Sequence, residues 1–220
     1  MTADRLLELA GAELGVRESP FGSNRVKYNT AYYGREVSGQ GYPWCCTFMW
    51  WLFKQAKASK LFFGGARSAY APSLLIYHTK QGQAVSGDYA PGDVVFFDFN
   101  GNGTADHVGL CECWDGTYIT TIDGNTGEGS EANGGAVMRR KRHKKYICGA
   151  YRPCYEEEQE MTQLQFDNLM ADWLARQGEK PGSPWGKMAE AMRAGITDGS
   201  RPQSFATREE VATMIVAAKL

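Results

Sequence analysis

The sequence predicts an α+β domain over residues 1–155, followed by a small all-α domain over residues 156–220. Two observations lead to this prediction. Apolar residues recur at helical spacing in the first half of the chain, whereas from Pro91 onward they form short β-rich runs. Helices followed by an antiparallel meander make an α+β domain. The acidic run YEEEQE then changes the composition, and three helical patterns separated by Gly/Pro-rich segments complete the sequence.

Three helices are expected within residues 1–155. Leucines and alanines at helical spacing indicate the first helix over residues 3–15, ended by Gly15. The run CCTFMWWLFKQAKAS, which begins at Cys45, indicates a second helix with a basic C-terminus. A third is expected over residues 72–82, opened by Pro72. The segment between the first two helices is rich in Gly and Pro and is interpreted as loop.

The strand signals follow in order along the chain. They are the runs DVVFFDF, HVGLCECW and TYITTI, with Asp115-Gly116 as a two-residue turn between the last two. A further strand pair is expected at AVMRRKR and YICGAYR.

Charge and hydropathy exclude some classes of protein. With 24 Lys+Arg and 25 Asp+Glu the formal net charge is −1, which does not suit a nucleic-acid-binding protein. Charged residues interrupt the apolar runs, so we expect no membrane span. The first fifteen residues carry charges inside their apolar pattern, so we also expect no secretory signal.

Near-neutral charge conceals two different parts. Residues 1–155 contain 17 Lys+Arg and 14 Asp+Glu, whereas residues 156–220 contain 7 and 11. Every Cys and His lies in the first part, so chemistry by these groups is confined there. We expect mostly reduced thiols. Cys111 and Cys113 would face one side of a strand and, with Cys148 and Cys154, could form a zinc site, but their spacing does not favour it.

A thiol becomes a nucleophile when it ionises, and a helix N-terminus favours that ionisation. Cys45 occupies such a position, directly after Tyr42-Pro43-Trp44. A base must lie within reach of the thiol, and His107, which begins a strand, is favoured over His78 and His143. A third group must orient the imidazole. The strand returning past His107 ends in TIDGNTG and offers Asp123 or Asn125.

At these residues the sequence resembles a known family. The stretches ESPFGSNRVKYNTAYYG, YPWCCTFMWW, APGDVVFFDFNGNGTADHVGL, TIDGNTG and ICGAYRP, in this order, are similar to the CHAP family of cysteine, histidine-dependent amidohydrolases and peptidases, especially those of bacteriophage endolysins. The resemblance covers most of residues 5–155. It implies a papain-like α+β fold that cleaves amide bonds in bacterial peptidoglycan.

The resemblance also implies roles for single residues. Cys45 matches the nucleophile of the family and His107 its base, while Cys46 stands where the family often has a small residue. The family's orienting acid is usually Glu, two residues before Asn, and Asp123 and Asn125 fill these two places. Either could hold the imidazole, and Asp123 is favoured. Backbone N–H groups at the helix start would bind the oxyanion, with Gln40 or Tyr42 as less favoured side-chain donors.

A calcium site is a weaker hypothesis. Asp98, Asn100 and Asn102 alternate in the loop DFNGNGTAD as calcium ligands do, but position twelve is Gly109 rather than the bidentate Glu. An ordinary hairpin loop explains the same residues. The calcium loop that some CHAP enzymes carry before the nucleophile looks absent, because residues 22–44 contain no Asp. No cofactor is expected to be required.

Two further segments bear on partners. The basic run from Arg139 to Lys145 is interpreted as a solvated edge strand, with attraction to anionic wall polymers as the alternative. The end of the chain, WGKMAEAMRAGITDGSRPQSFATREEVATMIVAAKL, resembles part of an S-layer-homology repeat, which implies wall binding. Oligomerisation through residues 156–220 and simple stabilisation remain open.

Taken together, the residues and the resemblance predict a peptidoglycan hydrolase of the endolysin type, acting as N-acetylmuramoyl-L-alanine amidase or as endopeptidase. It would be present in the cytoplasm of the host bacterium before lysis and would act at the cell wall. The alternatives are a noncatalytic wall-binding protein, or a bacterial wall-remodelling enzyme or toxin of the same fold.

Overall fold

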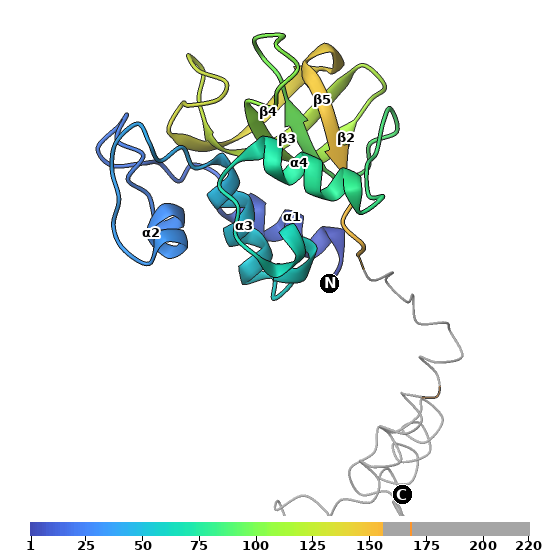
Figure 1. The fold of residues 1–220 in the computed structure, drawn as a ribbon, viewed down its shortest axis with the longest axis horizontal. Coiled ribbons are helices and arrows are strands. Elements are labelled where there is room, and N and C mark those ends of the chain that lie inside the picture. The colour runs from blue at the N-terminus through green and yellow to red at the C-terminus, as the bar shows by residue number, and fades with distance from the viewer. Residues whose placement is uncertain (156–167, 169–220) are drawn as a thin grey trace, which may run out of the picture. The chain divides into compact units, whose positions relative to one another are not determined.

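The computed structural model describes residues 1–155 and Asn168 (Figure 1). The domain expected over residues 156–220, including the S-layer-homology-like segment, lies outside the described residues apart from Asn168, so the boundary at residue 155 stays a prediction. None of the described helices is long and apolar enough to cross a bilayer.

The described part has mixed helices and one antiparallel sheet, which confirms the α+β prediction. The α-helices are α1 (Ala3–Ala12), α2 (Lys27–Tyr33), α3 (Cys45–Gln55) and α4 (Ala71–Lys80). The strands are β1 (Val94–Phe97), β2 (His107–Trp114), β3 (Tyr118–Thr126), β4 (Ala136–His143) and β5 (Ile147–Tyr151). Short 3₁₀ turns occupy Ser59–Leu61, Phe63–Gly65 and Lys144–Tyr146.

The sheet corrects one prediction about strand pairing. Its order is β4-β3-β2-β1-β5, so β4 and β5 lie at opposite edges and are not a pair. The meander leaves the outer edge of β1 unpaired, and β5 joins that edge, with Val94 opposite Tyr151. The turn at Lys144–Tyr146 carries the chain from β4 to β5. A five-residue strand thus covers a buried edge that would otherwise expose unpaired backbone groups.

Helix α2 was not predicted, because its segment looked like loop. It has no side-chain cap at its start, and Gly34 with φ 71° ends it. The helix is stabilised instead by packing on α3. The ring of Tyr28 is fully buried and lies 5.4 Å from the ring of Trp44 and 4.9 Å from that of Phe48. Burial of Tyr28 against α3 therefore stabilises a helix for which the local sequence signals are weak.

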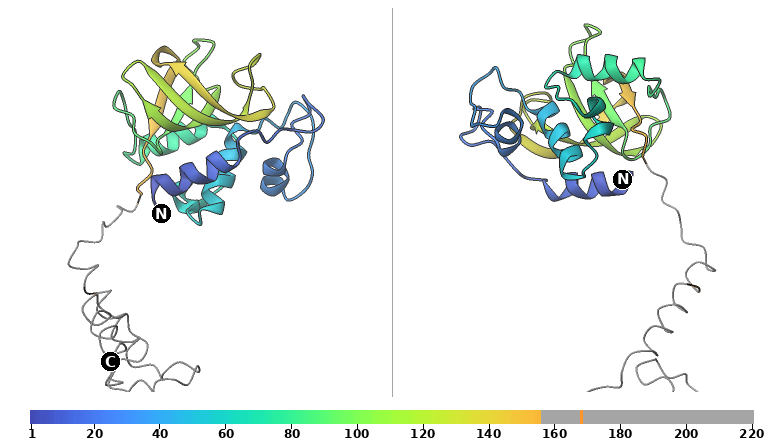
Figure 2. Two further views of the ribbon diagram at one scale, coloured as in Figure 1. Left: turned by 180° about the vertical axis from the view of Figure 1, so that it is seen from behind. Right: turned by 60° about the horizontal axis from the view of Figure 1, so that its bottom comes forward.

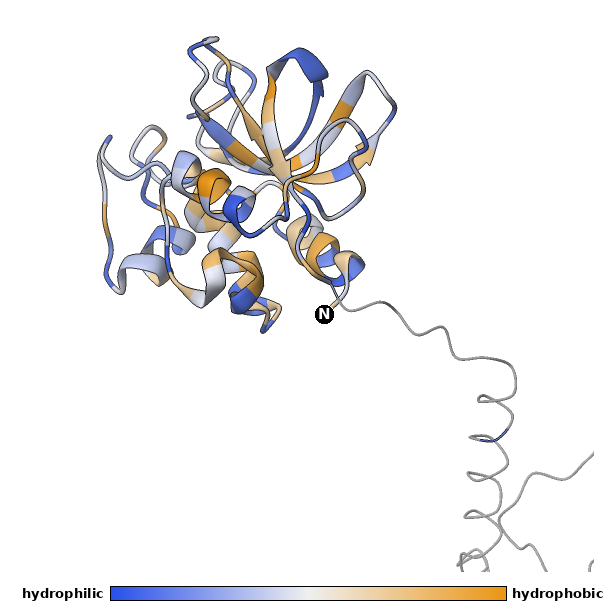
Figure 3. Ribbon diagram, turned by 45° about the vertical axis from the view of Figure 1, so that its right-hand side comes forward, coloured by the Kyte–Doolittle hydropathy of each residue, from blue (hydrophilic) through white to orange (hydrophobic). Residues whose placement is uncertain are grey.

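Helix α3 is the centre of the fold. Eight of its eleven residues are buried. It contacts the helices α1 and α2 as well as the strands β2 and β3. Figures 1 and 2 show α1 and α3 together beside one face of the sheet, with α4 across the strands. Apolar segments meet where helices and strands converge, and hydrophilic segments occupy outer loops (Figure 3).

Close approach of α3 to the sheet depends on a glycine. A Cβ atom added to Gly124 in β3 would lie 2.6 Å from Cβ of Phe48 and 2.7 Å from its Cγ. Real Cβ atoms do not come this close to their neighbours, so any side chain at this position would push the helix away from the strand. Gly124 therefore sets the spacing between α3 and β3.

The loop and bulge details differ from the expectations around β2. A register shift falls between Cys111 and Cys113, and Cys111 is buried whereas Cys113 is exposed. The extra residue of a β-bulge breaks the alternation of faces, so the two thiols do not share a side as expected. The connection to β3 spans the three residues 115–117, whereas two were expected. In this connection Asp115 Oδ1 accepts the backbone N–H groups of Thr117 and Tyr118.

All six cysteines lie within residues 1–155, and each is a free thiol.

The spacing role of Gly124 predicts the effect of a single methyl group. Gly124→Ala should lower the free energy of unfolding by about 1–3 kcal/mol, the usual cost of overpacking a core. Urea denaturation followed by circular dichroism measures the change. The matched control is Gly11→Ala in α1, where an added Cβ meets nothing within 4 Å. The control should be neutral or stabilising by up to about 1 kcal/mol, and equal destabilisation by both changes would contradict the packing argument.

Candidate active site

Cys45 is the first residue of α3, and its position is fixed by hydrogen bonds around Asn29 of α2. Asn29 Nδ2 donates to the carbonyl of Tyr42 at 2.8 Å, and Thr47 Oγ1 donates to Asn29 Oδ1 at 2.7 Å. Asn29 and Thr47 are fully buried. These bonds tie the segment before Cys45 and the first turn of α3 to the same buried side chain.

The N-terminus of α3 lies at the Cys45 thiol. The N-cap residue is Trp44, and it makes no side-chain capping bond. The backbone N–H of Cys46 bonds to the Cys45 thiol, and the positive end of the helix dipole lies beside it. This is the environment that favours a thiolate over a thiol.

His107 and Asp123 form a buried pair on neighbouring strands. His107 Nε2 and Asp123 Oδ2 are 3.0 Å apart, and both side chains are completely buried. Gly109 makes room for this contact, because a Cβ atom at that position would collide with Asp123 Oδ1. Among the described residues, Nδ1 of His107 has no hydrogen-bond partner, and the thiol of Cys45 acts on the ionisation of the imidazole.

The thiol and the imidazole shift each other's ionisation. A hydrogen bond from the Cys46 thiol, and then the hydrogen bond and charge of His107, lower the pKa of Cys45 well below its usual value, although burial opposes this. Burial alone would lower the pKa of His107, but hydrogen bonds with Asp123 and Cys45 and their charges raise it to about 9. Both shifts favour the charged forms, that is, a thiolate at Cys45 and an imidazolium at His107.

The two adjacent cysteines differ in their surroundings. Cys46 is buried and has its pKa raised well above the usual value by its hydrogen bond to Cys45 and by burial. His107 acts on the ionisation of Cys45 and not on that of Cys46. This agrees with the expectation that only one of two successive helical residues can face the imidazole.

Asn125 makes no hydrogen bond to His107 in the described part of the chain. Its Nδ2 donates to Asn133 Oδ1 at 3.1 Å, and its Oδ1 has no partner in the described part of the chain. Its backbone adopts φ 61°, next to a register shift between Asp123 and Thr126. The structure therefore places Asp123, and not Asn125, against the imidazole, and leaves Asn125 as a link to the loop at residues 127–135.

Sequence reasoning missed Arg142, which is buried beside Asp123. The basic run was interpreted as a solvated edge strand, and β4 is indeed an edge strand. However, Arg142 is only 5% exposed, and its NH1 donates to Asp123 Oδ2 at 2.6 Å. Burial acts to raise the pKa of Asp123. The charge of Arg142 and the hydrogen bond and charge of His107 outweigh burial, so this pKa lies below its ordinary value. The sequence signal for this arrangement was the spacing of two residues between Arg140 and Arg142, which puts both side chains on the same face of a strand. In the structure both pair with Glu131.

The other candidate residues have different partners. His78 stacks on Tyr151 at 3.5 Å and its Nδ1 lies 2.6 Å from Gln83 Oε1. His143 Nδ1 accepts the backbone N–H of Lys145. Neither contact involves Cys45.

The suggested oxyanion donors are also placed. Gln40 Nε2 donates to the carbonyl of Gly22 at 3.2 Å, and Tyr42 packs against the ring of Tyr33 at 5.2 Å. These side chains therefore have local structural partners, and the backbone donors at the start of α3 are the better candidates.

The suggested calcium loop is held together by its own amides. Asp98 accepts the backbone N–H groups of Gly101, Asn102 and Gly103. Desolvation acts to raise the pKa of Asp98, but these bonds outweigh it and lower the pKa. Asn100 Nδ2 donates to Asp106. Within residues 1–155 and Asn168, no cluster of three or more His, Cys, Asp or Glu suits a metal ion. Calcium binding at this loop stays an untested hypothesis.

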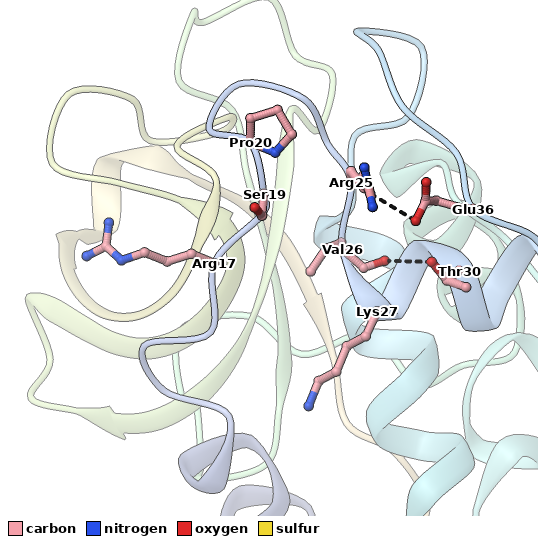
Figure 4. A pocket seen from close by; sticks show the side chains of 8 residues that line it. All are labelled: Arg17, Ser19, Pro20, Arg25, Val26, Lys27, Thr30 and Glu36. Carbon is pink, nitrogen blue, oxygen red and sulfur yellow. Dashed lines mark hydrogen bonds and ion pairs between the residues drawn. The ribbon is translucent and has the colours of Figure 1, made fainter.

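An open depression of about 310 Å³ lies between α2 and the segment before it (Figure 4). Its lining is mostly polar and cationic, and an ion pair of 2.9 Å joins Arg25 to Glu36 across one side. It is lined by Arg17, Ser19, Pro20, Arg25, Val26, Lys27, Thr30 and Glu36. None of the candidate catalytic residues lines it.

Comparison with known proteins gives one family and a distant structural likeness. No curated protein matches the chain. The solved structure "The crystal structure of Ly7917" is 16% identical with a TM-score of 0.44, and the same protein "with the hydrolyzing product of MDP" is 15% identical with a TM-score of 0.45. Each match covers 70% of this chain but only 63% of that protein. Residues 37–125 match the family model of the CHAP domain, a range that contains Cys45, His107, Asp123 and Asn125.

Proposed function

We propose that this protein is a peptidoglycan hydrolase that cleaves an amide bond in the peptide part of the bacterial cell wall by a thiol mechanism. One observation carries the proposal: a buried imidazole–carboxylate pair at 3.0 Å lowers the pKa of a thiol at the start of α3 through the imidazole. The match of residues 37–125 to the CHAP domain supports this class of reaction. We further propose that it acts in phage lysis as an endolysin.

The proposed reaction is an acyl transfer in two steps. The Cys45 thiolate attacks the carbonyl carbon of the amide, and backbone N–H groups at the start of α3 bind the oxyanion of the tetrahedral intermediate. His107 then gives its Nδ1 proton to the leaving amine, which departs as the C–N bond breaks. A thioester of Cys45 remains.

Water completes the cycle. Neutral His107 takes a proton from the water as it attacks the thioester, the C–S bond breaks, and the Cys45 thiolate and the imidazolium are restored. The net reaction consumes one water and releases one carboxylic acid and one amine. Asp123 remains ionised throughout and keeps Nε2 of the imidazole protonated, so that Nδ1 is the nitrogen that exchanges protons with substrate.

The first test separates the two adjacent thiols. Cys45→Ala should lower the rate of turbidity loss of susceptible cell walls by at least about a thousandfold, because the nucleophile is gone. Cys46→Ala should keep activity within about tenfold, because it loses one hydrogen bond to the thiolate.

A wild-type rate for Cys45→Ala would refute the thiol mechanism, whereas no turbidity loss with the wild-type protein would favour the noncatalytic wall-binding protein. Loss of activity in Cys46→Ala alone would move the nucleophile to Cys46.

The pH dependence follows from the thiolate–imidazolium pair. Activity requires the Cys45 thiolate and a protonated His107, so it should fall below the lowered pKa of Cys45 and again above about pH 9, where His107 loses its proton. The measurement is kcat/KM on soluble wall fragments between about pH 4 and pH 11, which extends about two pH units above the alkaline limb. Activity that only rises up to pH 9, like that of an ordinary thiol, would contradict the ion pair.

The bond that is cut follows from the products. Amidase activity should yield stem peptides with new free L-alanine amino groups and intact glycan strands, whereas endopeptidase activity should yield new ends within the peptides. Mass spectrometry of the released fragments distinguishes them, with Cys45→Ala as the blank. Glycan strands cut between sugars would contradict both assignments.

A further inference from the structure

Arg142 differs from its neighbours in the basic run of β4. It is 5% exposed, whereas the side chains of Arg139 and Lys141 are 52% and 61% exposed and pair with acidic residues at the surface. An arginine is rarely buried unless its charge is paired. The contacts of Arg142 explain its burial.

The guanidinium of Arg142 bridges the candidate active site and the loop at residues 127–135. Its NH1 donates to Asp123 Oδ2 at 2.6 Å and to Thr121 Oγ1 at 3.2 Å. Its Nε donates to Glu131 Oε2 at 2.8 Å, and its NH2 donates to Thr126 Oγ1 at 3.3 Å. All three nitrogens are used, and each bond has a fixed direction because the group is planar.

Two aromatic rings hold the guanidinium and the imidazole together. Arg142 lies over the ring of Phe97 at 4.8 Å and over that of Phe99 at 5.4 Å. The imidazole of His107 lies 6.4 Å and 6.1 Å from the same two rings. The cation and the imidazole therefore pack on one apolar support, with the Asp123 carboxylate oxygen bonded to both.

We propose that Arg142 is a positioning residue of this site: its guanidinium holds Asp123 Oδ2 on His107 Nε2 and balances the buried carboxylate charge. The inference rests on the proposed function only for its consequence in catalysis. Its physical content concerns the ionisation of Cys45 and can be measured without any wall substrate.

The charges alternate from the thiol to the surface. The thiolate of Cys45, with Cys46 beside it, is followed by the imidazolium of His107 and the carboxylate of Asp123. Next come the guanidinium of Arg142 and the half-exposed carboxylate of Glu131, which also pairs with Arg140. These residues lie in order on α3, β2, β3, β4 and the loop at residues 127–135.

Removing the buried cation has a predictable sign. Without Arg142 the buried thiolate, imidazolium and carboxylate carry a net charge of −1. A buried net charge is unfavourable, so the cluster should hold a proton more tightly. The thiolate of Cys45 should then form only at higher pH, because Arg142 no longer offsets the negative charge of the thiolate and the carboxylate.

The experiment is the alkylation rate of Cys45 as a function of pH. Iodoacetamide reacts with the thiolate, and fragmentation of the Cys45 peptide in the mass spectrometer assigns the label to Cys45 and not to the adjacent Cys46 or to the exposed Cys113 and Cys154. The variants are Arg142→Gln and Arg142→Lys in the full chain. The matched control is Arg139→Gln, which removes an exposed arginine of the same strand that pairs with Glu112.

Arg142→Gln should move the acid limb of the profile up by about one pH unit, which is a tenfold loss of alkylation rate below the limb. Arg139→Gln should leave the limb unchanged. A folded Arg142→Gln variant, checked by circular dichroism, with the wild-type limb would overturn the proposal. Equal shifts of the limb in Arg139→Gln and Arg142→Gln would overturn it as well.

The variant Arg142→Lys tests the positive charge of Arg142 separately from the several hydrogen bonds that its planar guanidinium donates. Arg142→Lys keeps the positive charge, so the acid limb should stay within about 0.3 pH units of wild type. It cannot bond Asp123, Glu131 and Thr126 at once, so the plateau rate should fall severalfold as His107 loses its restraint. If Arg142→Gln does not fold, this variant decides: a plateau equal to wild type rejects the positioning role, and a reduced plateau supports it.

Failure of the proposed function looks different. If Cys45→Ala still lyses walls while Arg142→Gln shifts the alkylation profile, Arg142 controls the thiol but the thiol mechanism is wrong. If Cys45→Ala is inactive while Arg142→Gln has the wild-type profile, the thiol mechanism stands and the role of Arg142 is rejected.

Discussion

The contact between His107 Nε2 and Asp123 Oδ2 is the interaction on which the site depends. Both side chains are completely buried, so neither can exchange its partner for water. Burial acts to lower the pKa of His107, but this contact and the Cys45 thiol together raise it to about 9. The imidazole and the helix N-terminus both favour ionisation of the Cys45 thiol. One hydrogen bond thus links the sheet to the proposed nucleophile on α3.

The surrounding fold provides the space for this contact through two glycines. Gly109 lets the Asp123 carboxylate cross β2 toward His107, and Gly124 lets α3 approach β3 closely enough to bring Cys45 to the imidazole. Asn29 holds the first turn of α3 from the other side through Thr47. The geometry is therefore set by rigid elements, and not by loops, which is the arrangement that precise catalytic positioning requires.

Buried charge explains why a basic residue of an edge strand matters. Asp123 has to remain ionised in the interior, and this needs a cation beside it. Arg142 supplies that cation, and its bond to Glu131 ties the loop at residues 127–135 to the same cluster. Asn125 makes a second tie to this loop through Asn133. The residue that the sequence pattern offered as an alternative to Asp123 thus has a separate contact in the structure.

Within the residues that the structure describes, the sequence by itself determined the α+β class, three of the four α-helices, the position of each strand and the candidate residues Cys45, His107, Asp123 and Asn125. Local periodicity, turn residues and motif order carry this information. Only the tertiary structure decided that β5 pairs with β1, that Tyr28 stabilises α2, that Asp123 rather than Asn125 meets the imidazole, and that Arg142 is buried. Each of these depends on which side chains meet across distant segments, and a pattern of nearby residues does not encode such contacts.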